Sequence, residues 1–189
     1  NSNFIFCILE DHAGNFWVGT NGQGINVLNK DHKVIFRYTP DPKLSNDRLL
    51  PLNGYIRDII EDKLGNIWIA THGGGMAVLN LATGKFTIYT TRNSSLPNDK
   101  VLTLHPDQLG NIWAGTFGNG AAMLNPNTNK FTCFSESNGL QNNTVYKIVE
   151  DRQGLIWVSS NKTISSIYIN SKKINNYGYH NGVQNNTFV

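Results

Sequence analysis

Apolar and polar residues alternate along this chain within a longer period of about 45 residues. Each period contains an Asp, a Gly turn and a short apolar segment around a Trp. Steps of 51, 45 and 44 residues separate the four tryptophans, Trp17, Trp68, Trp113 and Trp157. Self-similarity at a nearly fixed spacing is the signature of a repeat architecture, so the fold is expected to consist of four related units.

Within one unit the pattern predicts short strands rather than helices. In the second copy, apolar segments of five to seven residues alternate with turn signals such as Asp62–Gly65 and Ala82–Gly84. Tight turns of this kind join antiparallel neighbours. The four predicted strands of this copy are Tyr55–Glu61, Asn66–Thr71, Met76–Asn80 and Lys85–Tyr89.

The second strand of each unit is apolar on both of its faces. Ile67 and Ile69 point to one side, whereas Trp68 and Ala70 point to the other. A sheet with two apolar faces must lie between neighbours, as the blades of a β-propeller do. The predicted fold is therefore all-β, a β-propeller segment of four four-stranded antiparallel blades. The blades are expected at approximately 1–50, 51–96, 97–140 and 141–189.

Length variation is confined to one part of the repeat. The step from each Trp to the aromatic residue of the fourth strand is 21, 21, 21 and 20 residues. The connections between units differ, and the longest runs from Thr39 to Gly54. In an up-and-down blade these connections share one end with the loops between strands two and three. Binding is expected at this loop end, because variable loops on a rigid scaffold commonly carry function.

Composition excludes several classes of protein. Only 15% of the residues are charged, and the net charge of +3 is scattered, with Lys172 and Lys173 as the densest basic pair. Nucleic-acid binding needs a concentrated basic face, so no nucleic-acid partner is predicted. The sequence has no apolar run of the length that a membrane helix requires. The chain is expected to be soluble, or the soluble piece of a larger protein.

The repeated residues have structural explanations. One Asp per unit before a Gly turn lacks the alternation of a calcium loop, so turn capping is favoured for Asp11, Asp62, Asp107 and Asp151. The tryptophans alternate with Ile and Val, which favours blade packing over sugar stacking. The sequence therefore predicts no catalytic residue, metal site or cofactor.

The two cysteines, Cys7 and Cys133, lie in apolar segments without a short metal-binding spacing. Buried free thiols are the favoured interpretation, and a disulfide remains the alternative.

One position in each unit is free to vary. The residue after the Thr or Ser that ends the second strand is Asn21, His72, Phe117 or Asn161. All four would lie at the loop end, and amides, an imidazole and an aromatic ring suit a carbohydrate ligand. These residues form the candidate ligand site, with ordinary exposed loop residues as the alternative interpretation.

The combined motif resembles a known repeat family. The stretch D-x-x-G-N-x-W-[IV]-[AG]-T, then G-G-G-[ML]-x-x-L-N and G-L-x-N-N, is similar to the two-component regulator propeller repeats. The likeness covers all four units, although the fourth lacks the glycines after its second strand. The inter-blade element stands at Gly139–Asn143 and Gly182–Asn186, and more loosely at Leu96–Asp99 and Leu44–Asp47.

This resemblance implies a role in signalling. Such repeats occur in the periplasmic sensor regions of inner-membrane hybrid two-component histidine kinases of Bacteroidetes. Those sensors have seven-bladed propellers and detect breakdown products of polysaccharides. The resemblance implies an oligosaccharide ligand, and partners in the remaining blades and the kinase module of the parent chain. It implies no enzymatic activity for this segment and contact with a membrane only through the parent.

Four blades are fewer than the seven that the resemblance implies, so this chain is expected to be part of a larger propeller. Its two outer blade faces would then be apolar and exposed, and the isolated segment is expected to self-associate.

Two other functions remain open at this stage. Streptogramin lyases are similar propellers that act as enzymes with a metal and a histidine base, and only His72 qualifies for such a role here. A propeller scaffold that binds protein rather than sugar is the second alternative.

Overall fold

The computed structural model describes residues 4–45, 47–161 and 163–183. Residues 184–186 of the expected inter-blade element at Gly182–Asn186 therefore lie outside the described part. Besides strands, the described part contains two short 3-10 helices, η1 (Glu136–Asn138) and η2 (Tyr179–Asn181). The strands are β1 (Ile5–Glu10), β2 (Phe16–Thr20), β3 (Ile25–Leu28), β4 (Val34–Thr39), β5 (Asp47–Leu49), β6 (Ile56–Glu61), β7 (Ile67–Thr71), β8 (Met76–Asn80), β9 (Lys85–Tyr89), β10 (Val101–Pro106), β11 (Ile112–Thr116), β12 (Ala121–Asn125), β13 (Lys130–Phe134), β14 (Val145–Glu150), β15 (Ile156–Ser160), β16 (Thr163–Tyr168) and β17 (Lys173–Tyr177).

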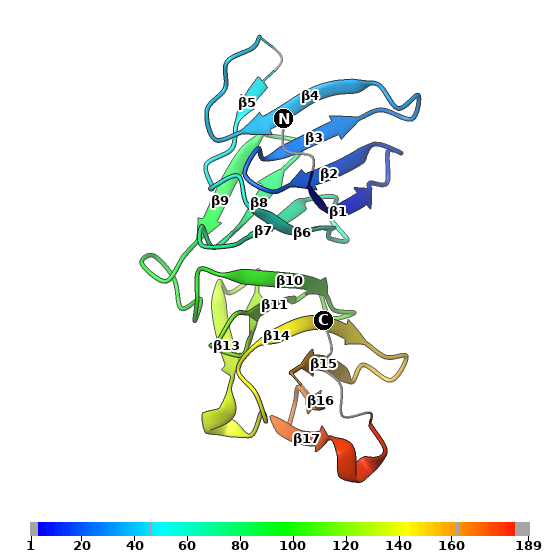
Figure 1. Ribbon diagram of the computed structural model, residues 1–189, viewed down its shortest axis with the longest axis vertical. Coiled ribbons are helices and arrows are strands. Elements are labelled where there is room, and N and C mark those ends of the chain that lie inside the picture. Colours follow the sequence, from blue (N-terminus) through cyan, green and yellow to red (C-terminus); the bar gives the residue numbers. More distant parts are fainter. Residues whose placement is uncertain (1–3, 46, 162, 184–189) are drawn as a thin grey trace. The chain divides into compact units, whose positions relative to one another are not determined.

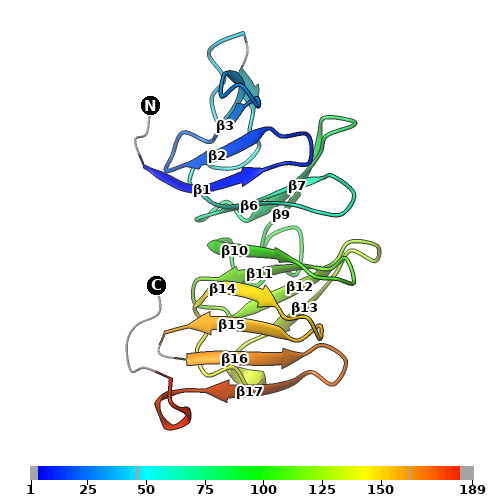
Figure 2. The same ribbon diagram turned by 90° about the vertical axis from the view of Figure 1, so that its right-hand side faces the viewer.

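The strands form one sheet per repeat, which confirms the predicted all-β blades. The strand orders are β6-β7-β8-β9, β10-β11-β12-β13 and β14-β15-β16-β17, and Figure 2 shows the last of these side by side in chain order. The first sheet differs from the prediction because a fifth strand, β5, pairs with β4 in parallel. This strand comes from the long connection between Thr39 and Gly54, which folds back along its own blade.

The chain divides into two compact units. Unit 1 comprises residues 1–94 and 99–101 and holds the first two sheets. Unit 2 comprises residues 95–98 and 102–189 and holds the last two. Each unit is a pair of blades with its own apolar core, and each is described by itself.

In unit 1 the first sheet packs face to face on the sheet of β6 to β9 (Figure 1). Trp17 and Ile25 of the first sheet are buried against Ile56, Ile59 and Ile67 of the second. In strand β7 every residue is buried, as a strand with two apolar faces requires. The core of this unit is therefore an interface between blades.

Unit 2 repeats this packing with different side chains. Trp113 and Ala121 of its first sheet are buried together with Val145, Ile148 and Ile156 of its second. Both units thus place the Trp of one blade on the first and second strands of the next blade. The prediction that the tryptophans pack blades is confirmed for Trp17 and Trp113 by this arrangement.

Each Trp also packs on the aromatic ring of the fourth strand in its own sheet. The ring centroids lie 5.7 Å apart for Trp17 and Tyr38 and 5.2 Å apart for Trp113 and Phe134, with interplanar angles of 13° and 24°. In the other two blades the ring centroids lie 5.9 and 5.4 Å apart, stacked for Trp68 and Tyr89 and tilted by 31° for Trp157 and Tyr177. This contact explains why the step between the two aromatic positions is nearly constant, because both rings must meet across the sheet.

The repeated Asp caps the turn before the Trp strand and also binds the Trp itself. In the first blade Asp11 Oδ1 accepts hydrogen bonds from the N–H groups of Ala13 and Asn15, at 3.0 and 2.8 Å. Asp11 Oδ2 accepts from Trp17 Nε1 at 2.8 Å. The indole contact recurs in the other blades at 2.8, 3.0 and 2.9 Å. Turn capping is thus confirmed, and the bond to Trp, six residues further on, adds a second role.

These hydrogen bonds favour the charged form of the Asp. In Asp151 the bond from Trp157 is the largest influence and lowers the pKa of the carboxyl group below its ordinary 3.8. In Asp11 burial acts in the opposite direction, but the bonds from Trp17 and the turn outweigh it, and this pKa is lowered as well. The carboxylates of Asp11 and Asp151 are therefore ionised acceptors at neutral pH.

One face of the first sheet is exposed, whereas the equivalent face of the second sheet is covered by a neighbouring blade. Ile5 and Ile8 of β1 are 57% and 63% exposed. The equivalent residues of β6, Ile56 and Ile59, are 0% and 4% exposed because the first sheet packs on them. The first sheet therefore presents a blade-packing surface to the solvent.

Replacing Asp107 with Ala tests the link between turn and tryptophan. Asp107 is 1% exposed and binds Asn111 and Trp113, so its loss leaves the buried indole N–H without an acceptor. The free energy of unfolding should fall by about 3 kcal/mol, the upper range for hydrogen bonds to a charged group. Urea denaturation followed by tryptophan fluorescence measures this. Asp31→Ala, in an exposed hairpin, is the control and should change stability by less than about 0.5 kcal/mol.

The exposed face predicts association of the isolated chain. Light scattering at high concentration should give a mass above that of one chain, because contiguous apolar surface of this kind drives association. The double change Ile5→Lys and Ile8→Lys should restore the monomer, whereas Leu64→Lys, at a turn residue already 87% exposed, should not. A monomeric mass for the unmodified chain would contradict the prediction.

Candidate functional site at the loop end

In the first three repeats the glycine-rich loop after the second strand donates hydrogen bonds to the backbone at the start of the following repeat. In unit 1 the N–H groups of Gly22 and Gly24 both donate to the carbonyl of Gly54, at 2.8 and 3.1 Å. Gly24 has a φ of 81°, and a Cβ there would overlap the carbonyl of Tyr38, so a side chain is excluded. The loop thus holds the start of the following blade through its backbone alone.

The second and third repeats contain the same contact, in which glycine N–H groups donate to a backbone carbonyl at the start of the next repeat. We call this contact the clamp. Gly73 and Gly75 both donate to the carbonyl of Asp99 at 2.9 Å, and Gly120 donates to that of Asn143. This pairing confirms within each unit that the inter-blade connections and the loops between strands two and three share one end. The glycines of the repeat are therefore explained by close backbone approach.

The position of the clamp shows that the first inter-blade element was predicted at the wrong residues. Leu44–Asp47 was expected to be the first inter-blade element, but it lies in the insertion that leads into β5. The equivalent position is Asn53–Gly54. Asn53 Nδ2 donates to the carbonyl of His72 at 3.1 Å, just as Asn98 Nδ2 donates to that of Phe117 at 2.9 Å. The extra residues of the insertion caused the inter-blade element to be predicted several residues before its actual position.

Two of the four predicted ligand positions lie in unit 1. Asn21 and His72 are half-buried, and each directly follows the second strand of its blade. Asn21 bridges Tyr55 and His72 bridges Lys100 in isolated antiparallel pairs. The N–H of His72 also donates to the carbonyl of Tyr55 at 2.9 Å. The backbone of both positions is thus fixed, while the side chains are free to differ.

The other two positions lie in unit 2. Phe117 is 46% exposed, and Asn161 is half-buried in the turn after β15. In the fourth blade the clamp glycines are replaced, and Ser160 Oγ instead shares a hydrogen bond with Thr163 Oγ1 at 2.6 Å. Each unit therefore carries one candidate pair at equivalent places in successive blades.

The electrostatic surroundings of His72 keep its side chain neutral. Burial is the largest influence, and the positive charges of Arg57 and Lys100 act in the same direction, so the pKa of His72 lies below its ordinary 6.5. The Arg57 guanidinium itself lies 3.9 Å from the centre of the Phe6 ring. A neutral imidazole offers one hydrogen-bond donor and one acceptor, which suits a hydroxyl group.

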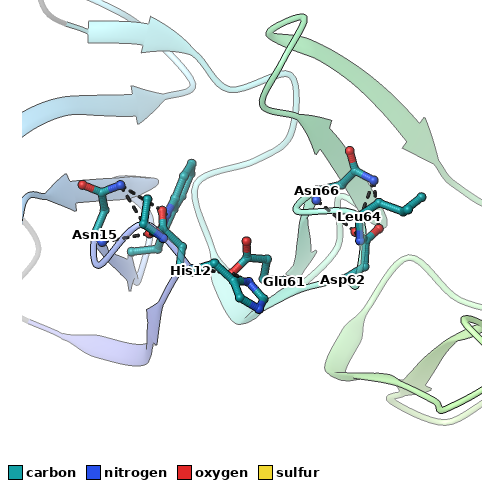
Figure 3. Close-up of polar contacts among 9 residues, drawn as sticks. His12, Asn15, Glu61, Asp62, Leu64 and Asn66 are labelled. Atoms are coloured by element: carbon teal, nitrogen blue, oxygen red, sulfur yellow. Dashed lines mark hydrogen bonds and ion pairs between the residues drawn. The ribbon is translucent and has the colours of Figure 1, made fainter.

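The opposite end of the blades carries an inter-blade contact that the sequence analysis missed. Figure 3 shows His12 of the first turn beside Glu61 at the end of β6. Glu61 accepts from the His12 N–H at 2.8 Å and lies 2.7 Å from its Nδ1. In unit 2 the N–H of Gln108 donates to Glu150 in the same way, at 2.8 Å. A Glu at the end of the first strand in three of the four repeats was the available signal.

The remaining sequence predictions concern thiols, metals and membranes. Neither cysteine forms a disulfide in the structure; Cys7 is half-buried, but Cys133 is exposed, so the expected burial was wrong there. Cys133 Sγ lies 3.7 Å from the carbonyl oxygen of Ser95. Among the described residues no group of His, Cys, Asp and Glu could hold a metal ion, and no helix is long and apolar enough to span a membrane.

Relatives of the chain include a histidine kinase. Histidine kinase P4 of Formosa agariphila is 31% identical over 80 residues, which are 42% of this chain and 6% of that protein.

Solved structures share the fold over nearly the whole chain. The extracellular domain of hybrid two-component system BT3049 from B. thetaiotaomicron is 26% identical, with a TM-score of 0.83. The match covers 98% of this chain and 24% of that domain. The corresponding domain of BT4673 is 22% identical with a TM-score of 0.74, over 93% of this chain and 24% of the other, and shows the fold alone. This chain thus spans about a quarter of these domains.

The repeats themselves match a defined family. The sequence pattern of the two-component regulator propeller fits residues 1–22, 50–73, 95–118 and 139–162. Each match begins near the first strand of one sheet and ends at the loop after the second, so it contains the Asp–Trp turn. The family pattern therefore recurs once in every blade, and the chain belongs to the two-component regulator propeller family.

Proposed function

We propose that this chain is a segment of the periplasmic sensing region of a hybrid two-component histidine kinase. In this proposal its loop end contributes to binding oligosaccharides released from complex polysaccharides. The family and the likeness to extracellular domains of hybrid two-component systems support the sensor role. The remaining blades and the kinase module of the parent protein would be its partners, and the segment itself would catalyse no reaction.

One observation carries the ligand proposal. The residue after the second strand differs among the repeats, as Asn21, His72, Phe117 and Asn161, and in the first two blades its backbone pairs with the start of the next blade. A purely structural position would keep one type of residue, as the Asp and Trp positions do. Amides and a neutral imidazole can bind hydroxyl groups, and the exposed ring of Phe117 can stack on the apolar face of a sugar.

Signalling would require two arrangements of the parent sensor. A ligand shifts the balance between them only if it binds one arrangement more tightly. Rigid blades whose connections are held by backbone hydrogen bonds would transmit a ligand-induced displacement better than flexible loops. The reason is that packed interfaces resist continuous deformation. The segment would therefore act as a firm surface whose loop end changes its contacts when the ligand binds.

The enzyme alternative receives less support from the site. A lyase would need several polar catalytic groups that converge with a metal. At the loop end of unit 1 His72 stands among Arg57, Lys100 and backbone groups, and the described residues hold no metal-binding cluster. We therefore retain the binding function.

A double substitution of His72 and Phe117, the two varied positions that are not Asn, tests this function. His72→Ala and Phe117→Ala together, in the intact sensor, should weaken binding of the inducing oligosaccharide by at least about tenfold, as expected when a hydrogen bond and a stacking contact are both lost. Calorimetry measures the affinity, and transcription of a target gene measures the output.

Leu64→Ala and Leu109→Ala provide a matched control. These exposed turn residues belong to the same two blades but lie at the opposite end, so affinity and output should not change. Unchanged oligosaccharide affinity in the His72 and Phe117 variant would remove the loop-end site. Output that depends on a bound protein instead of a sugar would support a scaffold.

A further inference from the structure

A continuous row of paired residues crosses the loop end of unit 1. Asn21 pairs with Tyr55, and His72 pairs with Lys100, as isolated antiparallel bridges. Tyr55 and His72 also stand opposite each other, because they extend the register of β6 and β7 by one residue. The His72 N–H donates to the Tyr55 carbonyl at 2.9 Å. The pairing therefore runs unbroken from Asn21 to Lys100, and we call these four residues the loop-end row.

The pairing places the side chains of the loop-end row together. Directly opposite residues of antiparallel strands present their side chains on the same face, with Cβ atoms about 4.5 to 5.5 Å apart. Tyr55 is 50% exposed, and its ring lies beside Gly22, where an added Cβ would be 3.5 Å from it. Lys100 is exposed and His72 is half-buried. The row thus offers an amide, an aromatic ring, an imidazole and an ammonium group in succession.

Two cations gather at the His72 end of the row. Arg57 of β6 lies two residues after Tyr55, and its guanidinium is 3.9 Å from the centre of the Phe6 ring. The positive charges of Arg57 and Lys100 both lower the pKa of His72, so both lie near its imidazole. This end of the row is therefore a place of positive potential.

The carboxylates next to these cations in the sequence accept other hydrogen bonds. Asp99 Oδ1 accepts from the Thr91 N–H at 2.7 Å, and Asp99 Oδ2 accepts from Thr91 Oγ1 at 3.1 Å. Asp58 Oδ1 accepts from the N–H of Ile59 at 3.0 Å. The carboxylate of Asp99 is thus held at Thr91, on the connection between blades.

The repeat does not require either cation. The residue before the first strand is Phe4, Tyr55, Lys100 or Thr144, and the second residue of that strand is Phe6, Arg57, Leu102 or Tyr146. Aromatic, aliphatic and hydroxyl side chains therefore serve the fold at these places. Because the sheets form without a cation there, folding does not explain two cations beside one imidazole.

We propose that the loop-end row and Arg57 bind an acidic oligosaccharide, with its carboxylate or sulfate group at His72, Lys100 and Arg57. This inference rests on the proposed sensing of oligosaccharides and names the class of sugar. Arg and Lys bind anionic oxygens through charge-assisted hydrogen bonds, and an imidazole can donate one more. The exposed ring of Tyr55 can stack on the apolar face of a sugar, and the Asn21 amide can bind a hydroxyl group.

Matched pairs of disaccharides test the charge preference on the unmodified sensor region that contains this chain. Calorimetry would compare digalacturonic acid with its dimethyl ester, as the carboxylate pair, and neocarrabiose sulfate with neocarrabiose, as the sulfate pair. At least one acidic member should bind. Its neutral counterpart should bind at least about tenfold more weakly, because the charge-assisted bonds are lost. Added salt should weaken the binding of the acidic member.

Removing the two cations tests their place in the site. Arg57→Gln with Lys100→Gln should weaken binding of that acidic disaccharide at least about tenfold. Lys33→Gln with Lys85→Gln is the matched control, because it removes two positive charges from exposed residues between the third and fourth strands of the same unit. This control should retain the affinity. Circular dichroism and a thermal melt verify that both variants are folded.

Three results would overturn the inference. They are the absence of binding by both acidic disaccharides, a neutral counterpart that binds as tightly as its acid, and a folded Arg57 and Lys100 variant with unchanged affinity for the acid. The proposed function fails on a different result, which is unchanged affinity and transcription with the inducing oligosaccharide in the His72 and Phe117 variant. Equal binding of a neutral disaccharide would thus contradict the acidic class while it supports sugar binding.

Discussion

The hydrogen bond from the Trp indole to the turn Asp is the contact on which each blade depends. The same carboxylate caps the turn between the first two strands through its other oxygen, and the bond fixes the indole on one face of the second strand. The fixed indole then stacks on the aromatic ring of the fourth strand and, within each unit, packs on the next blade. One carboxylate thus couples a local turn to the sheet and to the interface between blades. A buried, charge-assisted bond of this kind specifies geometry as well as contributing stability.

This arrangement separates a constant part of the blade from a variable part. The strands and the Asp–Trp turn keep their spacing because aromatic rings must meet across the sheet. The loop end is fixed differently, through backbone donors of glycine that bind the next blade without using side chains. Since the clamp needs no particular side chain at Asn21 or His72, these positions can change while the backbone stays in place. A repeat of this construction can therefore acquire new surface chemistry without loss of the fold.

Structural features that recur in every repeat were predicted from the sequence, whereas features that occur once or join distant residues were not. The Trp spacing and the two-faced apolar strands predicted the sheets, and the bounds of β8 and β9 were predicted to the residue. Strand β5 was missed because three residues in a long connection give no periodic signal. The contact of His12 with Glu61 and the first clamp at Gly54 join residues that are far apart in sequence, so local patterns do not show them. The loop-end positions were located by alignment, but their ligand depends on chemistry that no repeat encodes.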